Sequence, residues 1–258
     1  IEARSEEIAR VESENSGMTL RGARGDVEDA LRALRRWPEL LPDGLRSGIL
    51  GPVAARDDAG RYAVQYEPFG VVARLVAFNH PFLFAVKGTA AALLAGNAVV
   101  VKPADPTPMS AMLLMDIVDE VLPPGVFSVV VGDWAAGDAL VRDPRIRRIA
   151  FTGSTETGLA IQRAAAEVNV KSVSLELGGK NALVICSDAD LEGIGRRIVD
   201  AMSLTTVQGQ SCGSLSRVFA HRDVYERVLD ELVDAVSRLR LGSALDEEAD
   251  VGPMVSEG

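Results

Sequence analysis

Cys212 is the residue of this chain whose type and surroundings point most directly to chemistry. It is one of only two cysteines, and it lies in the segment Gly209-Gln210-Ser211-Cys212-Gly213. Glycines on both sides allow a ligand to approach the backbone closely, and a cysteine thiolate is a strong nucleophile. Most free cysteines, however, are small buried hydrophobic residues. Taken alone, the segment leaves both interpretations open.

A cation and a carboxylate follow a short apolar run further upstream. The run ends in Lys102-Pro103-Ala104-Asp105, and a carboxylate at the end of a strand can accept hydrogen bonds from the ribose hydroxyls of a dinucleotide. A loop that carries a surface lysine and a surface aspartate is the simpler interpretation. These four residues by themselves do not exclude it.

A second apolar run leads into Phe151-Thr152-Gly153-Ser154-Thr155-Glu156-Thr157-Gly158. Ser154 is suited to cap the helix that follows, and the N–H groups and dipole at the start of a helix favour a phosphate group. The segment matches neither GxGxxG nor the P-loop pattern. A purely structural helix cap therefore explains the serine equally well.

Two further polar residues lie within or directly after apolar strand patterns. Glu176 lies in Leu175-Glu176-Leu177-Gly178-Gly179, where a buried carboxylate would suit general acid or base catalysis and an edge-strand position would leave it in solvent. Asn79 lies in Phe78-Asn79-His80-Pro81. Its amide can donate to an oxyanion, or it can simply form a turn before a proline-capped helix.

The elements that must position these residues alternate regularly from Gly70 onward. Strands are predicted at 71–78, 98–102, 126–131, 147–151 and 170–177, and helices at 82–95, 107–122, 135–141 and 155–167. Apolar strands separated by helical crossovers predict a parallel sheet with helices on both faces, which is a doubly wound α/β domain. Ligands of such sheets bind beyond the carboxyl ends of the strands.

The remaining segments predict a helix, a hairpin and a second α/β unit. An amphipathic helix is predicted over 26–37, and two extended runs at 49–55 and 61–67 predict a β-hairpin. A second series has strands at 182–186 and 216–220, a helix from about residue 191, and a last helix opened by Asp223 with Glu226 at capping-box spacing. This second α/β unit does not visibly finish before Gly258.

Composition excludes several classes of protein. The formal net charge of −10 argues against nucleic acid or an anionic membrane as the main partner. No stretch reaches the roughly 18 unbroken apolar residues that a membrane span needs. Two cysteines are too few for a disulfide framework, and the charged first residues do not resemble a signal peptide. We therefore expect a cytoplasmic protein with no nucleic-acid or membrane partner.

In this order, and with Cys212 following them, the four sites closely resemble the aldehyde dehydrogenase superfamily in its hydrolytic, NAD(P)-dependent branch. The resemblance covers the whole chain. It includes the segments Pro68-Phe69-Gly70-Val71, Leu122-Pro123-Pro124-Gly125-Val126-Phe127, Phe151-Thr152-Gly153-Ser154, Leu175-Glu176-Leu177-Gly178-Gly179-Lys180 and Gly209-Gln210-Ser211-Cys212. Each segment alone is a weak match, but the ordered set is specific. It favours the nucleophilic interpretation of Cys212.

The resemblance implies oxidation of an aldehyde to a carboxylic acid with hydride transfer to NAD(P). Cys212 would attack the aldehyde carbon, and the Asn79 side chain and the backbone N–H of Cys212 would hold the oxyanion of the thiohemiacetal. Glu176 would activate Cys212, or the water that hydrolyses the thioester, or both in turn. No metal is expected to take part.

The same resemblance assigns five residues to the cofactor. Lys102 and Asp105 would hold the adenosine ribose, Ser154 would hold the pyrophosphate, and Gly153 and Phe78 would belong to the same site. The carboxylate favours NAD, although aspartate is shorter than the more frequent glutamate and leaves NADP open. The segments around Asn79 and Cys212 favour a small-molecule aldehyde of the aromatic class.

The resemblance also predicts how the chain is divided. Residues 1–47 and 69–178 would form the dinucleotide-binding domain, 48–68 a hairpin of an oligomerisation element, and 179–258 a catalytic domain that is incomplete at its C-terminus. The full-length protein would be a homodimer or homotetramer. Because family members continue with a Glu-x-Phe-Gly-Pro motif that this chain lacks, a second hypothesis is a truncated, catalytically silent dinucleotide-binding or assembly module.

Overall fold

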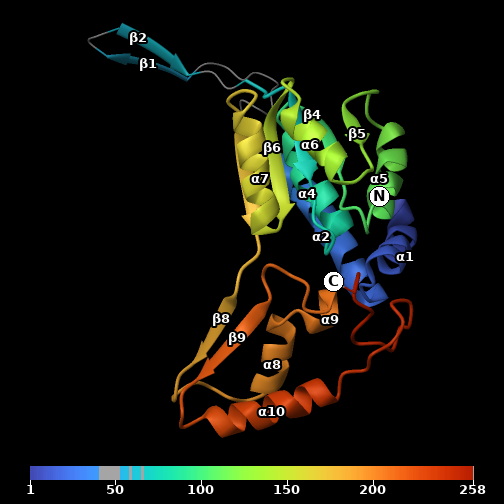
Figure 1. Ribbon diagram of the computed structural model, residues 1–258, viewed down its shortest axis with the longest axis vertical. Coiled ribbons are helices and arrows are strands. Elements are labelled where there is room, and N and C mark those ends of the chain that lie inside the picture. The colour runs from blue at the N-terminus through green and yellow to red at the C-terminus, as the bar shows by residue number, and fades with distance from the viewer. Residues whose placement is uncertain (41–52, 58–59, 65–66, 258) are drawn as a thin grey trace.

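The computed structural model describes residues 1–40, 53–57, 60–64 and 67–257. Its largest part is a five-stranded parallel sheet with the strand order β5-β4-β3-β6-β7 (Figure 1). The strands are β3 (Val71–Leu75), β4 (Ala98–Lys102), β5 (Phe127–Val129), β6 (Ile146–Gly153) and β7 (Ser172–Leu177). The chain adds strands on one side of β3 and then crosses to its other side, as doubly wound sheets do. The predicted fold class is confirmed.

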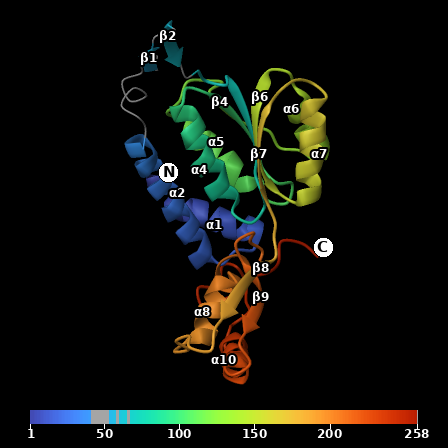
Figure 2. The same ribbon diagram turned by 90° about the vertical axis from the view of Figure 1, so that its left-hand side faces the viewer.

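Helices cover both faces of this sheet (Figure 2). One face carries α1 (Ser5–Ser16), α2 (Leu20–Leu40), α4 (Pro81–Leu94) and α5 (Met109–Asp119), and the other carries α6 (Trp134–Arg142) and α7 (Thr155–Ala166). Successive residues of β3 point to opposite faces, so Val72 packs in the first core and Ala73 in the second. No helix within the described ranges is long and apolar enough to cross a membrane.

The largest differences from the predicted elements lie at the N-terminal end. Helix α1 was not predicted, and α2 begins at Leu20, well before the predicted helix over 26–37. Strand β3 ends at Leu75, so Phe78 and Asn79 lie in the loop that leads to α4. Helix α5 begins at Met109, after the N-cap Pro108, and not at residue 107 as predicted.

A smaller unit follows the sheet and lies at the other end of the molecule (Figure 1). Its two parallel strands are β8 (Asn181–Ile185) and β9 (Leu215–Ala220), and its helices are α8 (Ile194–Ala201), α9 (Leu204–Val207) and α10 (Tyr225–Ser237). Ile198 and Val228 are buried in its small core. The predicted capping box is wrong, because Val224 is the N-cap of α10 and no side chain caps this helix.

The predicted hairpin is present in its central part. Strands β1 (Val53–Asp57) and β2 (Gly60–Val64) pair antiparallel, with Val53 opposite Val64. Residues 49–52, 58–59 and 65–66 of the predicted hairpin lie outside the described residues. The paired strands extend away from the sheet and its helices (Figure 1). Their part in oligomerisation stays a prediction.

A buried carboxylate connects α1 to the start of α4. Glu12 of α1 has no exposed surface, and its Oε1 accepts a hydrogen bond from the backbone N–H of Phe82 at 3.0 Å. Burial raises the pKa of the Glu12 carboxyl to about 7, against the opposing effect of the Ser110 hydroxyl and the Phe82 N–H. Even so, neither Glu12 Oε2 nor Ser110 Oγ completes a hydrogen bond of normal geometry within the described chain.

The raised pKa makes the stability of the folded chain depend on pH. The folded state holds the Glu12 proton more tightly than the unfolded state, so this contribution to stability is complete below about pH 4.5 and is lost as the pH rises to about 7. Glu12→Gln keeps an acceptor and carries no charge. We expect it to be more stable than wild type at pH 8 by up to roughly 3 kcal/mol, and much closer to wild type at about pH 4.5.

Urea unfolding of both proteins at the two pH values measures this difference. A free-energy gap between variant and wild type that stays constant with pH would contradict the account.

Candidate active site

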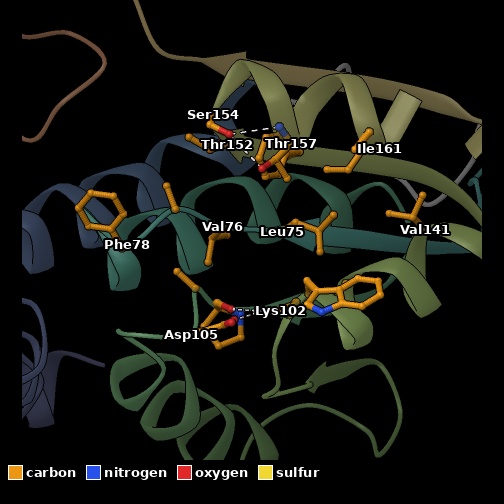
Figure 3. A pocket seen from close by; sticks show the side chains of 18 of the residues that line it. Leu75, Val76, Phe78, Lys102, Asp105, Val141, Thr152, Ser154, Thr157 and Ile161 are labelled. Atoms are coloured by element: carbon orange, nitrogen blue, oxygen red, sulfur yellow. Dashed lines mark hydrogen bonds and ion pairs between the residues drawn. The ribbon is translucent and has the colours of Figure 1, made fainter. Parts of the chain in front are cut away.

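A cleft of about 590 Å³ opens where β3, β4 and β6 end, and residues of α6 and α7 also line it (Figure 3). Its lining includes all five residues predicted to bind a cofactor, namely Phe78, Lys102, Asp105, Gly153 and Ser154. They come from three separate strand ends, and only the folded sheet brings them to one cavity. This is the position at which open parallel sheets bind their ligands.

Lys102 is the last residue of β4 and forms one polar side of the cleft. Its Nζ lies 2.6 Å from Asp105 Oδ1 and donates to the carbonyl of Pro103 at 3.0 Å. The lysine side chain is only 8% exposed, whereas the Asp105 side chain is 55% exposed. The surface-lysine interpretation is therefore wrong. The buried Lys102 ammonium contacts one oxygen of the Asp105 carboxylate, and this carboxylate is still accessible to a ligand.

Ser154 forms the other polar side, at the start of α7. Its Oγ accepts a hydrogen bond from the backbone N–H of Thr157 at 3.1 Å and donates to Thr157 Oγ1 at 2.9 Å. The predicted helix cap is present. The amides of Thr155 and Glu156 have no partner within the helix, so this end of α7 remains favourable for an anion.

The two polar sides face each other across an apolar surface. Figure 3 shows Ser154 and Thr157 on one side, Lys102 and Asp105 on the other, and Val76 between them. Such a cavity suits an elongated ligand that has an anionic centre, hydroxyl groups and flat apolar rings. A dinucleotide has all three, so the residues present fit such a cofactor.

Trp134 was not among the residues selected from the sequence. It is the first residue of α6, its surface is 78% exposed, and it lines the same cleft. A tryptophan in solvent beside a cavity offers a flat face to a ring system. The sequence signal that could have identified Trp134 is its position as an aromatic residue directly before the helix predicted at 135–141.

Asn79 lies in the loop between β3 and α4, next to Phe78 on the cleft. Only 9% of its surface is exposed. It makes no side-chain hydrogen bond with any residue that the structure describes. Its amide N–H groups are therefore available to a ligand, which a simple turn-forming asparagine would not require.

Glu176 is exposed to solvent on β7. Strand β7 is the last of the five described strands of its sheet, and Glu176 pairs in register with Thr152 of β6. Of the two environments considered from the sequence, the edge-strand position is correct and the buried one is wrong. The carboxylate is open to water and to any segment that approaches this edge.

Cys212 is exposed as well, in the turn before β9. The interpretation as a buried hydrophobic residue is therefore wrong. Asn181, the first residue of β8, donates from Nδ2 to the carbonyl of Cys212 at 2.6 Å and to the carbonyl of Ser214 at 3.2 Å. These two contacts fix the backbone of the turn while they leave the thiol free.

The segment before Cys212 is anchored to α1 and to the C-terminal residues. Gln208 adopts a left-handed backbone with φ of 55°, and its Nε2 donates to the carbonyl of Gly17 and to that of Pro253 at 3.1 Å. A Cβ on Gly17 would lie 2.2 Å from the Pro253 oxygen, so this contact requires glycine. Gln208 was not among the residues selected from the sequence, although it belongs to a polar run beside the candidate nucleophile.

The predicted catalytic residues come from three separate segments. Within the described chain no hydrogen bond joins Cys212, Glu176 and Asn79. The folded chain therefore assembles the predicted cofactor residues, whereas the assembly of one catalytic centre stays a prediction.

The comparisons with known proteins agree with one another on the family that this chain resembles. A family model described as "Aldehyde dehydrogenase family" matches residues 1–258. "Aldehyde dehydrogenase tropH" of Talaromyces stipitatus is 39% identical over 252 residues, which are 97% of this chain and 48% of that protein. "Phenylacetaldehyde dehydrogenase" of Pseudomonas fluorescens is 37% identical over 263 residues, which cover 100% of this chain and 51% of that protein.

Solved structures agree in fold. The crystal structure of PnpE in complex with nicotinamide adenine dinucleotide superposes with a TM-score of 0.89 at 37% identity, covering 99% of this chain and 51% of that chain. A succinate-semialdehyde dehydrogenase from Burkholderia pseudomallei gives a TM-score of 0.90 at 32% identity, covering 99% and 52%. The chain thus spans about half the length of the proteins that it matches.

Asn181→Ala tests the anchor of the Cys212 turn. Each of the two hydrogen bonds that it removes contributes about 1 kcal/mol to the stability of the turn, so we expect amide exchange at residues 211–215 to become roughly thirty-fold faster while the five-stranded sheet stays protected. Hydrogen exchange read by mass spectrometry measures both regions. Asn169→Ala, which removes one side-chain contact elsewhere, serves as the control, and unchanged exchange around Cys212 in Asn181→Ala would contradict the anchor.

Proposed function

The chain belongs to the aldehyde dehydrogenase family, and we propose that it supplies the nucleophile, an oxyanion donor and the dinucleotide site for oxidation of an aldehyde to a carboxylic acid. The observation that carries this proposal is the cleft, because all five residues that the family resemblance assigns to a cofactor line it. Asn79 directly follows Phe78, which lines the cleft. Its side-chain amide makes no hydrogen bond within the described chain, so it is available to the proposed oxyanion.

The proposed cofactor is NAD, with NADP as the alternative. Lys102 and Asp105 hold the adenosine ribose, and the start of α7 behind Ser154 holds the pyrophosphate. When bound, the nicotinamide supplies the acceptor for the two electrons that leave the substrate carbon. The exposed carboxylate of Asp105 favours free ribose hydroxyls over a 2′-phosphate, because like charges repel.

Cys212 performs the first proposed step. Its sulfur, as the thiolate, attacks the aldehyde carbon, an S–C bond forms, and the carbonyl oxygen takes the negative charge. The Asn79 amide and the Cys212 backbone N–H donate hydrogen bonds to that oxygen. Loss of one such donor typically reduces the rate by about a hundred- to a thousand-fold. The exposure of Cys212 gives a substrate access to the thiol.

Glu176 performs the proposed proton transfers. It accepts the thiol proton before attack and releases it to solvent. A C–H bond of the thiohemiacetal carbon then breaks, its electron pair leaves with the hydrogen for the acceptor that the cofactor would supply, and a thioester remains. Glu176 later accepts a proton from the water that adds to the thioester carbon. The C–S bond then breaks, the carboxylic acid leaves, and the Cys212 thiolate is restored. Solvent contact at the edge of β7 supports this role, because it gives the carboxylate access to water.

The proposed substrate is a small aldehyde of the aromatic class. Similarity to phenylacetaldehyde dehydrogenase of Pseudomonas fluorescens supports this class.

The proposed assembly is a homodimer or homotetramer, and the paired strands β1 and β2, which project from the rest of the chain, support it.

Cys212→Ala tests the nucleophile. In the natural full-length protein it should abolish NADH formation from an aldehyde panel, because no other group takes the place of the thiolate. Cys186→Ala removes the other exposed cysteine and should leave turnover unchanged. NADH absorbance measures both, and full turnover in Cys212→Ala would refute the mechanism. NAD binding without turnover in wild type would instead favour the silent dinucleotide-binding module.

Asp105→Asn tests the ribose site. We expect NAD affinity to fall about ten- to a hundred-fold, because a hydrogen bond to a charged acceptor is worth about 1.5 to 3 kcal/mol. The affinity for NADP should fall less, so the ratio of NAD affinity to NADP affinity should decrease. Quenching of Trp134 fluorescence provides the titration signal. Asp119→Asn, an equal charge change at an exposed position of α5, is the control, and an unchanged NAD affinity in Asp105→Asn would contradict the assignment.

A further inference from the structure

The loop that carries Asn79 is held by two acidic residues that the proposed mechanism does not use. Glu12 belongs to α1 and Asp26 to α2, and both are buried. Each contacts a residue within three positions of Asn79, Glu12 at Phe82 and Asp26 at His80. Buried carboxylates are unfavourable unless they are bonded, so these contacts call for an explanation.

Glu12 acts as a helix cap from a distant part of the chain. Helix α4 begins at Pro81, which has no N–H, and His80 provides no side-chain cap. The first free amide of the helix is that of Phe82, and Glu12 Oε1 accepts its hydrogen bond at 3.0 Å. A carboxyl group there is favoured by the helix dipole. The start of α4 is therefore fixed relative to α1.

Asp26 fixes the residue directly after Asn79. Its Oδ2 lies 2.7 Å from Nδ1 of His80. The His80 ring also packs edge to face against Phe84, with ring centroids 5.4 Å apart. His80 is thus held from α2 and from α4 at once. The backbone on the C-terminal side of Asn79 has little freedom to move.

The same two helices also hold the segment that precedes Cys212. The Gln208 amide donates to the carbonyl of Gly17, which ends α1. At the start of α2, a Cβ on Gly22 would lie 2.8 Å from the Thr206 oxygen of α9, so α2 and α9 are in close contact. Helices α1 and α2 therefore contact both the Asn79 loop and the chain that leads to Cys212.

We propose that Glu12 and Asp26 are positioning residues, which hold the Asn79 amide in the place where it meets the oxyanion formed at Cys212. This inference rests on the proposed function. Neither carboxylate touches the substrate, and both act through the backbone between His80 and Phe82. An amide that is displaced by about 1 Å loses much of its effect on the transition state, while substrate binding changes little.

A double-mutant cycle between Glu12→Ala and Asn79→Ala in the natural full-length protein tests this. Glu12→Ala should lower kcat about ten- to a hundred-fold and change KM less than about three-fold, because the contact matters in the transition state. In the Asn79→Ala background the same substitution should lower kcat less than about two-fold, because the group that it positions is already missing. Glu12→Gln keeps the acceptor and should restore most of the activity.

Three controls make the outcomes distinguishable. Glu14→Ala removes an exposed carboxylate from the same helix and should behave like wild type. The rate of Cys212 alkylation and the affinity for NAD report folding and should stay near wild type in Glu12→Ala. If Glu12→Ala does not fold, Asp26→Asn takes its place in the cycle, with a several-fold loss of kcat expected only when Asn79 is present.

Two outcomes overturn the inference. One is a loss of kcat from Glu12→Ala that is the same with and without Asn79, which indicates a general structural role. The same holds for Asp26→Asn where it takes the place of Glu12→Ala. The other is a full kcat in that single variant. Failure of the proposed function gives a different result, since the wild-type protein then forms no NADH or Asn79→Ala retains full turnover.

Discussion

The hydrogen bond from the Phe82 amide to the buried Glu12 carboxyl is the constraint that links the loop of Asn79, through α1, to the segment that leads to Cys212. It ties the start of α4 to α1, and α1 also meets the Gln208 segment through Gly17. An acid with no exposed surface destabilises a fold unless its partners compensate, and here one oxygen has an amide partner while the other has none of normal geometry within the described chain. The chain thus retains an unfavourable group at the point where two segments of the proposed site are joined.

The two halves of the candidate site differ in how far the folded chain completes them. The cleft that we propose for the dinucleotide is built from strand ends of one sheet, and a packed parallel sheet fixes such ends closely. The Lys102–Asp105 pair and the Ser154 cap are already formed there. Cys212 and Glu176 are exposed on separate segments. The segment before Cys212 contacts α1 and α2, whereas Glu176 lies on β7, the last of the described strands of its sheet.

Much of the fold could be predicted because its signals are local. Apolar strands with turn residues between them gave β4 its observed bounds, and Ser154 was identified as a cap from its neighbours alone. Helix α1 was missed because its sequence, Ser5–Ser16, is mostly polar and packs only Ile8 and Ala9 of its apolar residues in the core. The cap of α10 was misplaced because Asp223 had the right spacing, which does not ensure the cap geometry.

The sequence by itself determined the fold class, the family resemblance and the identity of the candidate residues, since residue types and their order along the chain carry these. The tertiary structure decided which residues meet. It buried Lys102 behind Asp105, left Glu176 in solvent, and brought Glu12 from α1 and Asp26 from α2 against the loop of Asn79. These contacts join residues far apart in sequence, and their geometry follows from helix and sheet packing, which no local pattern encodes.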